Sequence, residues 1–144
     1  MICKVTKKKL KPFMSFGKMP IANGFIKKQD IKKEYFFKME VGFSKKVSLF
    51  QLNDHPKPKM MFNKNYPFFT GSSRGMIAHF REYANWIRKN YLKDKKILME
   101  IGSNDGTFLQ NFKKDKIFSI GIEPSTNVAN ISRKKGINTK NCFF

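Results

Sequence analysis

The sequence predicts an α/β protein with a small β-rich N-terminal module, a connecting amphipathic helix and the first β-α-β units of a parallel sheet. Three observations support this fold class. Apolar residues recur first at every second position, then at every third or fourth position, and finally in short buried runs that alternate with helical segments. We expect the three parts to occupy residues 1–57, 58–94 and 95–144.

The first part contains short extended elements. A strand is predicted by the alternating apolar residues Tyr35, Phe37, Met39 and Val41. The run VSLFQL at 47–52 predicts its hairpin partner, and GKMP at 17–20 predicts a turn. The segment NDHPKPK at 53–59 has two prolines and no periodicity, which is typical of a linker.

The middle part contains one amphipathic helix of about four turns, preceded by a loop at 66–75. Its apolar residues follow at spacings of three or four, at Met76, Phe80, Tyr83, Ala84, Ile87 and Tyr91. Either Ser72 or Ser73 can cap its N-terminus. His79 has no nucleophile or metal ligand nearby in sequence, so we interpret it as an ordinary helix residue.

The last part alternates strands and helices, which predicts right-handed β-α-β units and a parallel sheet. We expect strands at 97–102 and 117–123, helices at about 106–114 and 125–135, and a strand-like piece at 137–144. Gly136 is placed to end the second helix in a left-handed conformation.

The net charge of +20 raises the question of nucleic-acid binding. Only four of the 30 basic residues are arginine, and the lysines are scattered along the chain in twos and threes. Because arginine is preferred for recognition of phosphates and bases, this pattern favours a solvated surface over a nucleic-acid interface. The same charge could attract an anionic small substrate.

Targeting signals and cysteines add two expectations. The sequence has no apolar run long enough to span a membrane and no signal-peptide core, so we expect a cytoplasmic protein without membrane partners. Its two cysteines, Cys3 and Cys142, lie at opposite ends of the chain. This spacing argues against a disulfide framework and against a metal site made of cysteines alone.

Candidate chemistry is concentrated in ILMEIGSNDGTFL at 97–109 and FSIGIEPS at 118–125. Gly102 allows a sharp turn after the first strand, and Gly106 allows the following helix start to pack closely, with its free N–H groups exposed. Glu123 follows Gly106 by 17 positions and ends the next strand, where a carboxylate can accept both ribose hydroxyls. An adenosyl cofactor would satisfy both elements, although incidental acids in an ordinary strand-loop-helix would look similar.

The spacing Glu100-x-Gly102-x-Asn104-x-Gly106 differs from a dinucleotide fingerprint because an acid precedes the first glycine. It resembles the first motif of class I S-adenosylmethionine-dependent methyltransferases, with Asn104 in place of the middle glycine. In that class this region receives the methionine end of the cofactor, and the acid after the second strand holds the ribose. The resemblance therefore implies cofactor contacts at Glu100, Gly102, Ser103, Asn104, Asp105, Gly106, Glu123, Pro124 and Ser125.

Over essentially its whole length the chain is similar to the sugar C-methyltransferases that act on nucleotide-linked keto-deoxysugars. The phrases that carry it, in order, are FGKMPIANGF, YFFKMEVGF, VSLFQL, MFNKNYPFFTGSS, HF, EIGSNDGTFL and GIEPS. Members of that family begin with a small zinc-binding domain, continue into a Rossmann-like methyltransferase domain and finish with a further domain. The resemblance implies S-adenosylmethionine as cofactor and a truncated methyltransferase sheet in this chain.

The zinc module departs from the family pattern. The four cysteine positions of the family are occupied here by Cys3, Thr6, Ser44 and Val47. One thiolate cannot complete a tetrahedral zinc site, so we expect no bound zinc and a module held by Phe, Tyr and Val packing. The loss of a metal should also lower the stability of so small a domain.

The catalytic part departs as well, because the family's proton-abstracting groups and much of its sugar-nucleotide pocket lie beyond residue 144, so no catalytic residue can be named. In the loop before the helix, Tyr66 matches the family, whereas Phe68 replaces a tyrosine and Thr70-Gly71 replaces two serines. Tyr66 and Ser73 are carried over as cofactor-pocket contacts.

We expect this chain to be inactive alone. Two alternatives stay open: a non-catalytic cofactor-binding module, and one half of a split enzyme whose C-terminal half is encoded separately.

Overall fold

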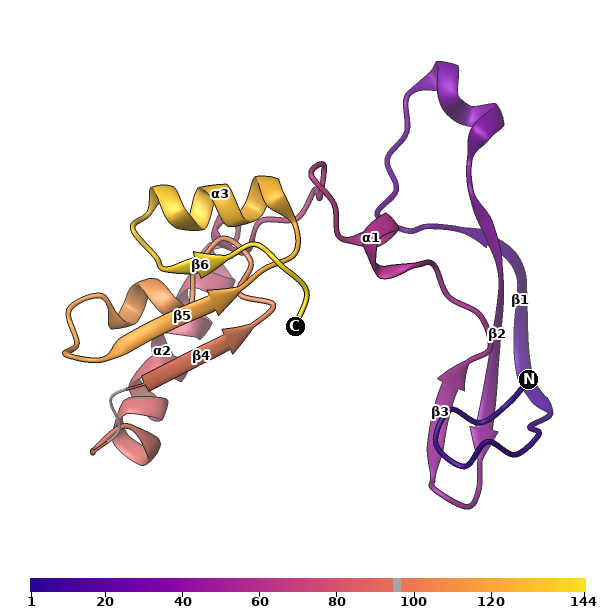
Figure 1. Cartoon of the computed structure of the whole chain (residues 1–144), viewed down its shortest axis with the longest axis horizontal. Coiled ribbons are helices and arrows are strands. Elements are labelled where there is room, and N and C mark those ends of the chain that lie inside the picture. The colour runs from indigo at the N-terminus through magenta and orange to yellow at the C-terminus, as the bar shows by residue number, and fades with distance from the viewer. Residues whose placement is uncertain (95–96) are drawn as a thin grey trace. The chain divides into compact units, whose positions relative to one another are not determined.

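A computed structural model describes residues 1–94 and 97–144 and divides the chain into two compact units, Met1–Met61 and Phe62–Phe144 (Figure 1). The first unit carries an antiparallel sheet, and the second carries a helix and a parallel sheet. This arrangement confirms the α/β class, with a β-rich module followed by a Rossmann-like parallel sheet. The segment boundary expected at residue 95 lies outside the described residues.

The first unit is built on a three-stranded sheet in the order β1-β2-β3. Its strands are β1 (Pro12–Pro20), β2 (Phe36–Ser44) and β3 (Leu49–Leu52), and its short helices are η1 (Lys28–Lys33) and α1 (Pro58–Met61). Strands β2 and β3 pair antiparallel, with Val41 opposite Leu52 and Ser44 opposite Leu49. The hairpin expected from the alternating pattern is therefore confirmed.

The turn expected at 17–20 is wrong, because these residues lie within β1. Gly17 has a φ of +73°, and the register with β2 shifts between Ser15 and Lys18. The glycine is thus used for an irregularity of the β-bulge type, in which the strand bends without reversing. Pairing resumes at Lys18, which lies opposite Lys38.

The second unit contains a long helix followed by a parallel sheet in the order β4-β5-β6 (Figure 1). Its elements are η2 (Thr70–Ser72), α2 (Arg74–Tyr91), β4 (Ile97–Ile101), η3 (Leu109–Phe112), β5 (Phe118–Ile122), α3 (Thr126–Lys134) and β6 (Thr139–Lys140). Ser73 caps α2 by accepting a hydrogen bond from the backbone N–H of Met76. Gly136 follows α3 with a φ of +76°, as predicted.

The helix expected at 106–114 is wrong in type and length, because the structure forms only the 3₁₀ helix η3 there. The side chain of Asn111 donates to the carbonyl oxygens of both Thr107 and Phe108. Such local bonds between side chain and backbone compete with regular α-helical bonding. The motif is thus followed by a tight turn and a short helix.

The core of the second unit lies between α2, η3 and one face of the sheet. It consists of buried Ala84, Phe108, Leu109, Phe112 and Ile137, with Leu98 of β4 packed against them. The other face of β4 and β5 exposes apolar side chains at Ile97, Met99, Ile101 and Phe118. Parallel sheets are normally covered on both faces, whereas the residues that the structure describes leave this face uncovered.

Candidate functional site

The turn after β4 is fixed to the end of β5. The backbone N–H groups of Gly102 and Ser103 donate to the carbonyl oxygen of Ile122, at 2.8 and 3.0 Å. Gly102 has a φ of +74°, which glycine adopts without strain. A Cβ built on Gly102 would have no described heavy atom within 4 Å. Open space therefore adjoins the backbone of this turn.

Glu123 lies directly beside the same turn and is buried. Its Oε2 accepts a hydrogen bond from the backbone N–H of Asn104 at 2.9 Å, and its Oε1 accepts one from the backbone N–H of Ser125 at 2.7 Å. Each carboxylate oxygen can still accept a further hydrogen bond. The carboxylate is therefore held in place at the carboxyl edge of the sheet, with acceptor capacity left for a ligand.

Asn104 joins the turn to the loop that precedes α2. It has a φ of +49°, a conformation that asparagine tolerates better than most residues. Its Oδ1 accepts from the backbone N–H of Thr70 at 2.9 Å, and its Nδ2 donates to the carbonyl oxygen of Phe68 at 3.1 Å. A glycine at this position could not make these bonds, which accounts for asparagine in the motif.

The two residues carried over from the loop before α2 differ in their surroundings. Burial, together with the charge of Glu123, raises the pKa of Tyr66, so the Tyr66 hydroxyl lies within electrostatic range of that carboxylate. The carbonyl oxygen of Tyr66 accepts from Nδ2 of Asn127 at 2.8 Å, which fixes the loop to α3. The hydroxyl of Ser73 serves as the helix cap.

Asp105 holds the second unit together. Its Oδ2 accepts from the backbone N–H of Gly71 at 3.0 Å and pairs with Nζ of Lys135 at 3.1 Å, while its Oδ1 accepts from Oγ1 of Thr107 at 2.6 Å. Burial opposes its ionisation, but these bonds outweigh that effect and hold the pKa of Asp105 below its usual value. Asp105 thus links the turn to the loop and to the end of α3.

Gly106 makes a second close contact with α3. A Cβ on Gly106 would lie 2.5 Å from Oγ of Ser132 and 3.0 Å from Cγ1 of Ile137. Its φ of +75° also favours glycine. The close packing expected at this position is therefore made with α3 and the residue that follows Gly136.

Several polar atoms around the turn have no hydrogen-bond partner in the described part of the chain. They are Oε2 of Glu100, Oγ of Ser103, Oγ of Ser125 and Oδ1 of Asn127. Ser103 and Ser125 are almost completely buried, and the carbonyl oxygen of the adjacent Pro124 accepts from Asn141. Buried polar groups in native proteins are normally satisfied by protein, water or ligand. This cluster therefore fits a polar ligand such as the methionine end of S-adenosylmethionine.

Glu100 has the most strongly perturbed carboxyl group of the cluster. Burial first, and then the charges of Asp105 and Glu123, raise its pKa to about 8. The carboxyl group is therefore mostly protonated at neutral pH when no ligand is bound.

The positions that hold zinc ligands in the resembling family still cluster in the first unit. The sulfur of buried Cys3 accepts from the backbone N–H of Thr6 at 3.4 Å. Hydrogen bonds from the Thr6 side chain and backbone lower the pKa of Cys3 to about 7, against the opposing effect of burial, and Ser44 contributes in the same direction. Val47 is exposed.

This donor set does not fit zinc. It supplies one thiol and two hydroxyls, and residues 1–94 and 97–144 contain no group of three or more His, Cys, Asp or Glu side chains placed to hold a metal ion. Of the Tyr and Val side chains expected to pack, Tyr35, Val5 and Val47 are exposed, whereas Val41 of β2 is partly buried. Phenyl rings do pack, with the Phe43 and Phe50 centroids 4.6 Å apart.

Gln51 supplies the cross-link between the N-terminal loop and β3. Its Oε1 accepts from the backbone N–H of Lys4, and its Nε2 donates to the carbonyl oxygen of Ile2, both at 2.9 Å. Gln51 is buried, so both bonds are shielded from water. No sequence pattern predicts this contact, because glutamine in a strand is ordinarily a surface residue.

We expect Gln51→Ala to destabilise the first unit by about 2 kcal/mol, because it leaves two backbone groups without partners. Amide hydrogen exchange of β2 and β3 measures this change, and Gln29→Ala on exposed η1 is the matched control. A chelator such as EDTA should leave wild-type exchange rates unchanged. Faster exchange of the wild-type amides in EDTA would show that a metal supports the module.

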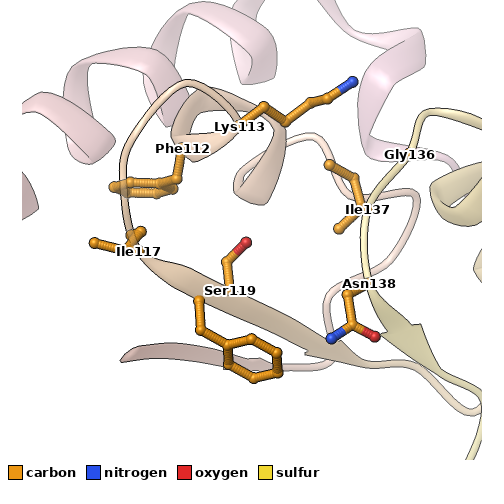
Figure 2. Close-up of a pocket in the computed structure, with 8 residues that line it drawn as sticks. Phe112, Lys113, Ile117, Ser119, Gly136, Ile137 and Asn138 are labelled. Atoms are coloured by element: carbon orange, nitrogen blue, oxygen red, sulfur yellow. The ribbon is translucent and has the colours of Figure 1, made fainter. Parts of the chain in front are cut away.

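Figure 2 shows a separate cavity of about 270 Å³ at the amino ends of β5 and β6. Its lining residues are Phe112, Lys113, Ile117, Phe118, Ser119, Gly136, Ile137 and Asn138. Nζ of Lys113 donates to the carbonyl oxygen of Lys135 at 2.8 Å, so this amine already has a partner. The cavity opens at the end of the strands opposite to the Gly102 turn and is not part of the cluster around Glu123.

Comparison with known proteins relates both units to one enzyme class. Residues 3–62 match the family Methyltransf_13, described as "Putative zinc binding domain". Over 128 residues the chain is 25% identical to the C-methyltransferase NovU of Streptomyces niveus. The chain is related to the C-methyltransferases. The match covers 88% of this chain and 30% of NovU, and it confirms the resemblance to a methyltransferase that carries a zinc-binding-type domain.

None of the helices in the described residues is both long and apolar enough to cross a membrane. This finding agrees with the absence of a long apolar run from the sequence.

Proposed function

We propose that the second unit binds S-adenosylmethionine as part of a C-methyltransferase acting on a nucleotide-linked keto-deoxysugar. One observation carries the proposal: the Gly102 turn and Glu123 are hydrogen-bonded together at the carboxyl ends of two parallel strands, with unpartnered polar atoms beside them. Ligands of open α/β sheets bind at this edge. The relation to a C-methyltransferase supports the choice of cofactor.

Each part of the site has its own role in this proposal. Glu123 accepts the ribose hydroxyls through the acceptor capacity that its two backbone bonds leave free. Gly102 allows the cofactor to approach the backbone, since no side chain fills the space beside it. Glu100 and Ser103 face the methionine end. When bound, the cofactor supplies an electrophilic methyl group.

We further propose that this chain binds the methyl donor without transferring the methyl group on its own. It spans about 30% of the length of NovU, and no catalytic base can be assigned among its described residues. In the described residues one face of β4 and β5 leaves Ile97, Met99 and Phe118 exposed, and the further helices and strands of a complete methyltransferase domain would cover this face. Positioning the sugar and removing its proton would then fall to those further elements.

Isothermal titration calorimetry of the purified chain with S-adenosylmethionine tests the binding proposal. We expect a binding signal for wild type, an unchanged signal for Glu82→Gln on the exposed face of α2, and at least 10-fold weaker binding for Glu123→Gln. Circular dichroism of each variant checks that the fold is retained. Absence of binding by wild type, or equal binding by folded Glu123→Gln, would contradict the proposed site.

A further inference from the structure

The cavity at the amino ends of β5 and β6 combines an apolar wall with a few polar groups (Figure 2). Phe112 and Ile137 form much of the wall and are almost completely buried, as members of the core of the second unit. The volume of about 270 Å³ lies just below the range of about 300–1,000 Å³ that is usual for small-molecule sites. The cavity is therefore large enough for a small ligand with an apolar body.

Ser119 places a hydroxyl group on the side of β5 that faces the core. It lies in register with Leu98 and two positions after Ile117, and both of these side chains pack against the core. A large apolar residue is usual at such a position of a parallel strand. The serine instead leaves space between Phe112 and Ile137, and its hydroxyl points into that space (Figure 2). This hydroxyl makes no hydrogen bond to any described residue, so it is free to bond to a ligand.

Lys113 brings a positive charge to the same cavity. Its Nζ donates to the carbonyl oxygen of Lys135 at 2.8 Å, and a Cβ on Gly136 would lie 3.3 Å from that nitrogen. An ammonium group has three N–H donors, so two of them remain for a ligand. The acid nearest to Lys113 in sequence is Asp115, whose carboxylate pairs with Nε of Arg88 at 2.7 Å. The positive charge of Lys113 is therefore available to an anion.

We propose that this cavity binds a small organic monocarboxylate with an apolar body. The carboxylate accepts hydrogen bonds from the ammonium group of Lys113 and the hydroxyl of Ser119, and the body lies against Phe112 and Ile137. A single lysine beside an apolar wall suits a monoanion better than a phosphate group, which proteins bind with arginines or several backbone N–H groups. The site is distinct from the Gly102 turn, because it lies at the opposite end of the strands.

Titration of the purified chain with benzoate, followed by amide ¹H–¹⁵N NMR, tests this site. We expect saturable shifts at the amides of Ser119, Ile137 and Asn138, and none at those of Gly102 and Ser125. Benzamide has the same shape without the charge. It should bind about 5-fold more weakly, because the lost ion pair is partly exposed to water.

Three variants separate a binding role of these residues from a structural one. Lys113→Met should weaken benzoate binding about 5-fold and should no longer distinguish benzoate from benzamide. Lys114→Met, at an exposed neighbour outside the cavity lining, is the matched control and should bind as wild type does. Ser119→Leu fills the cavity and should abolish binding of both ligands. The amide spectrum of each variant without ligand checks that the fold is retained.

Four results would overturn the proposal. They are the absence of saturable shifts with benzoate, equal affinity of wild type for benzoate and benzamide, an equal loss in Lys113→Met and Lys114→Met, and saturation of the same amides by inorganic phosphate in place of benzoate. If Lys113→Met weakened both ligands alike, its amine would serve only to hold the end of α3, and the proposed carboxylate contact would be wrong. None of these experiments contains S-adenosylmethionine, so their failure would leave the proposed function standing.

Discussion

Asp105→Ala should destabilise the second unit by about 3–5 kcal/mol, the cost typical of removing one member of a buried ion pair that also makes hydrogen bonds. Asp105 is 2% exposed and bonds to Gly71, Thr107 and Lys135, so its loss releases the loop and the end of α3 together. The fluorescence of Trp86 during urea unfolding reports on this unit selectively, because it is the single tryptophan of the chain. The midpoint should fall well below that of wild type.

The pH dependence of stability supplies a second readout for Asp105. The folded-state pKa of Asp105 is lowered. Its contribution to the stability of the folded state is therefore fully present above the ordinary aspartate pKa and is lost as the pH falls through the folded-state pKa. Wild type should therefore lose more stability than Asp105→Ala between neutral and strongly acidic pH. Asp94→Ala, at an exposed position after α2, is the matched control and should change stability by less than about 0.5 kcal/mol. If Asp105→Ala and Asp94→Ala lowered the stability by comparable amounts, the special role assigned to Asp105 would be wrong.

The parts of the fold that could be predicted are those that depend on neighbours in sequence. Gly102 and Gly136 both adopt the positive φ expected of a turn glycine and a helix-ending glycine. Ser73 caps the helix that the spacing of Phe80, Ala84 and Ile87 predicted. These features follow from local backbone geometry and from the 3.6-residue period. The place of Glu123 after the second strand follows from the same reasoning.

The parts that could not be predicted depend on contacts between distant residues. The sequence predicts Asn104 as a replacement for a motif glycine and as a cofactor contact, yet its side chain bonds to Thr70 and Phe68, more than thirty residues away. Asp105 and Lys135 lie about 30 positions apart, and nothing distinguishes Lys135 from the other lysines in the sequence. The short η3 depends on how Asn111 bonds to the backbone, which the apolar pattern does not encode.

The first unit matches a zinc-binding-type domain, although its donor set does not fit zinc. Residues 3–62 still match a family of zinc-binding-type domains, but the sulfur of Cys3 is now surrounded by hydroxyl-bearing Thr6 and Ser44. The Gln51 bonds join the same N-terminal loop to β3. Hydrogen bonds therefore connect the N-terminal loop to the sheet of this unit. Each such bond contributes only about 1 kcal/mol, so the module should remain marginally stable.

Glu100→Gln should increase the stability of the second unit, as expected where a binding site carries a group that destabilises the folded state. The pKa of Glu100 is raised from 4.5 to about 8, so the folded state keeps a proton that the unfolded state releases above about pH 4.5. Wild-type stability consequently falls as the pH rises from 4.5 to 8 and is constant above that range. Glutamine has no proton to lose and avoids this penalty.

The expected gain for Glu100→Gln is about 1–3 kcal/mol at pH 9 and close to zero at pH 4, after allowing for partial exposure of the carboxyl group. Urea unfolding followed by Trp86 at the two pH values measures the difference, and Glu82→Gln on the exposed side of α2 should show none. Equal stability of Glu100→Gln and wild type at pH 9 would mean that the folded protein ionises Glu100 without cost. A gain confined to high pH would instead show that ionisation of Glu100 destabilises the folded chain, because burial and the charges of Asp105 and Glu123 oppose it.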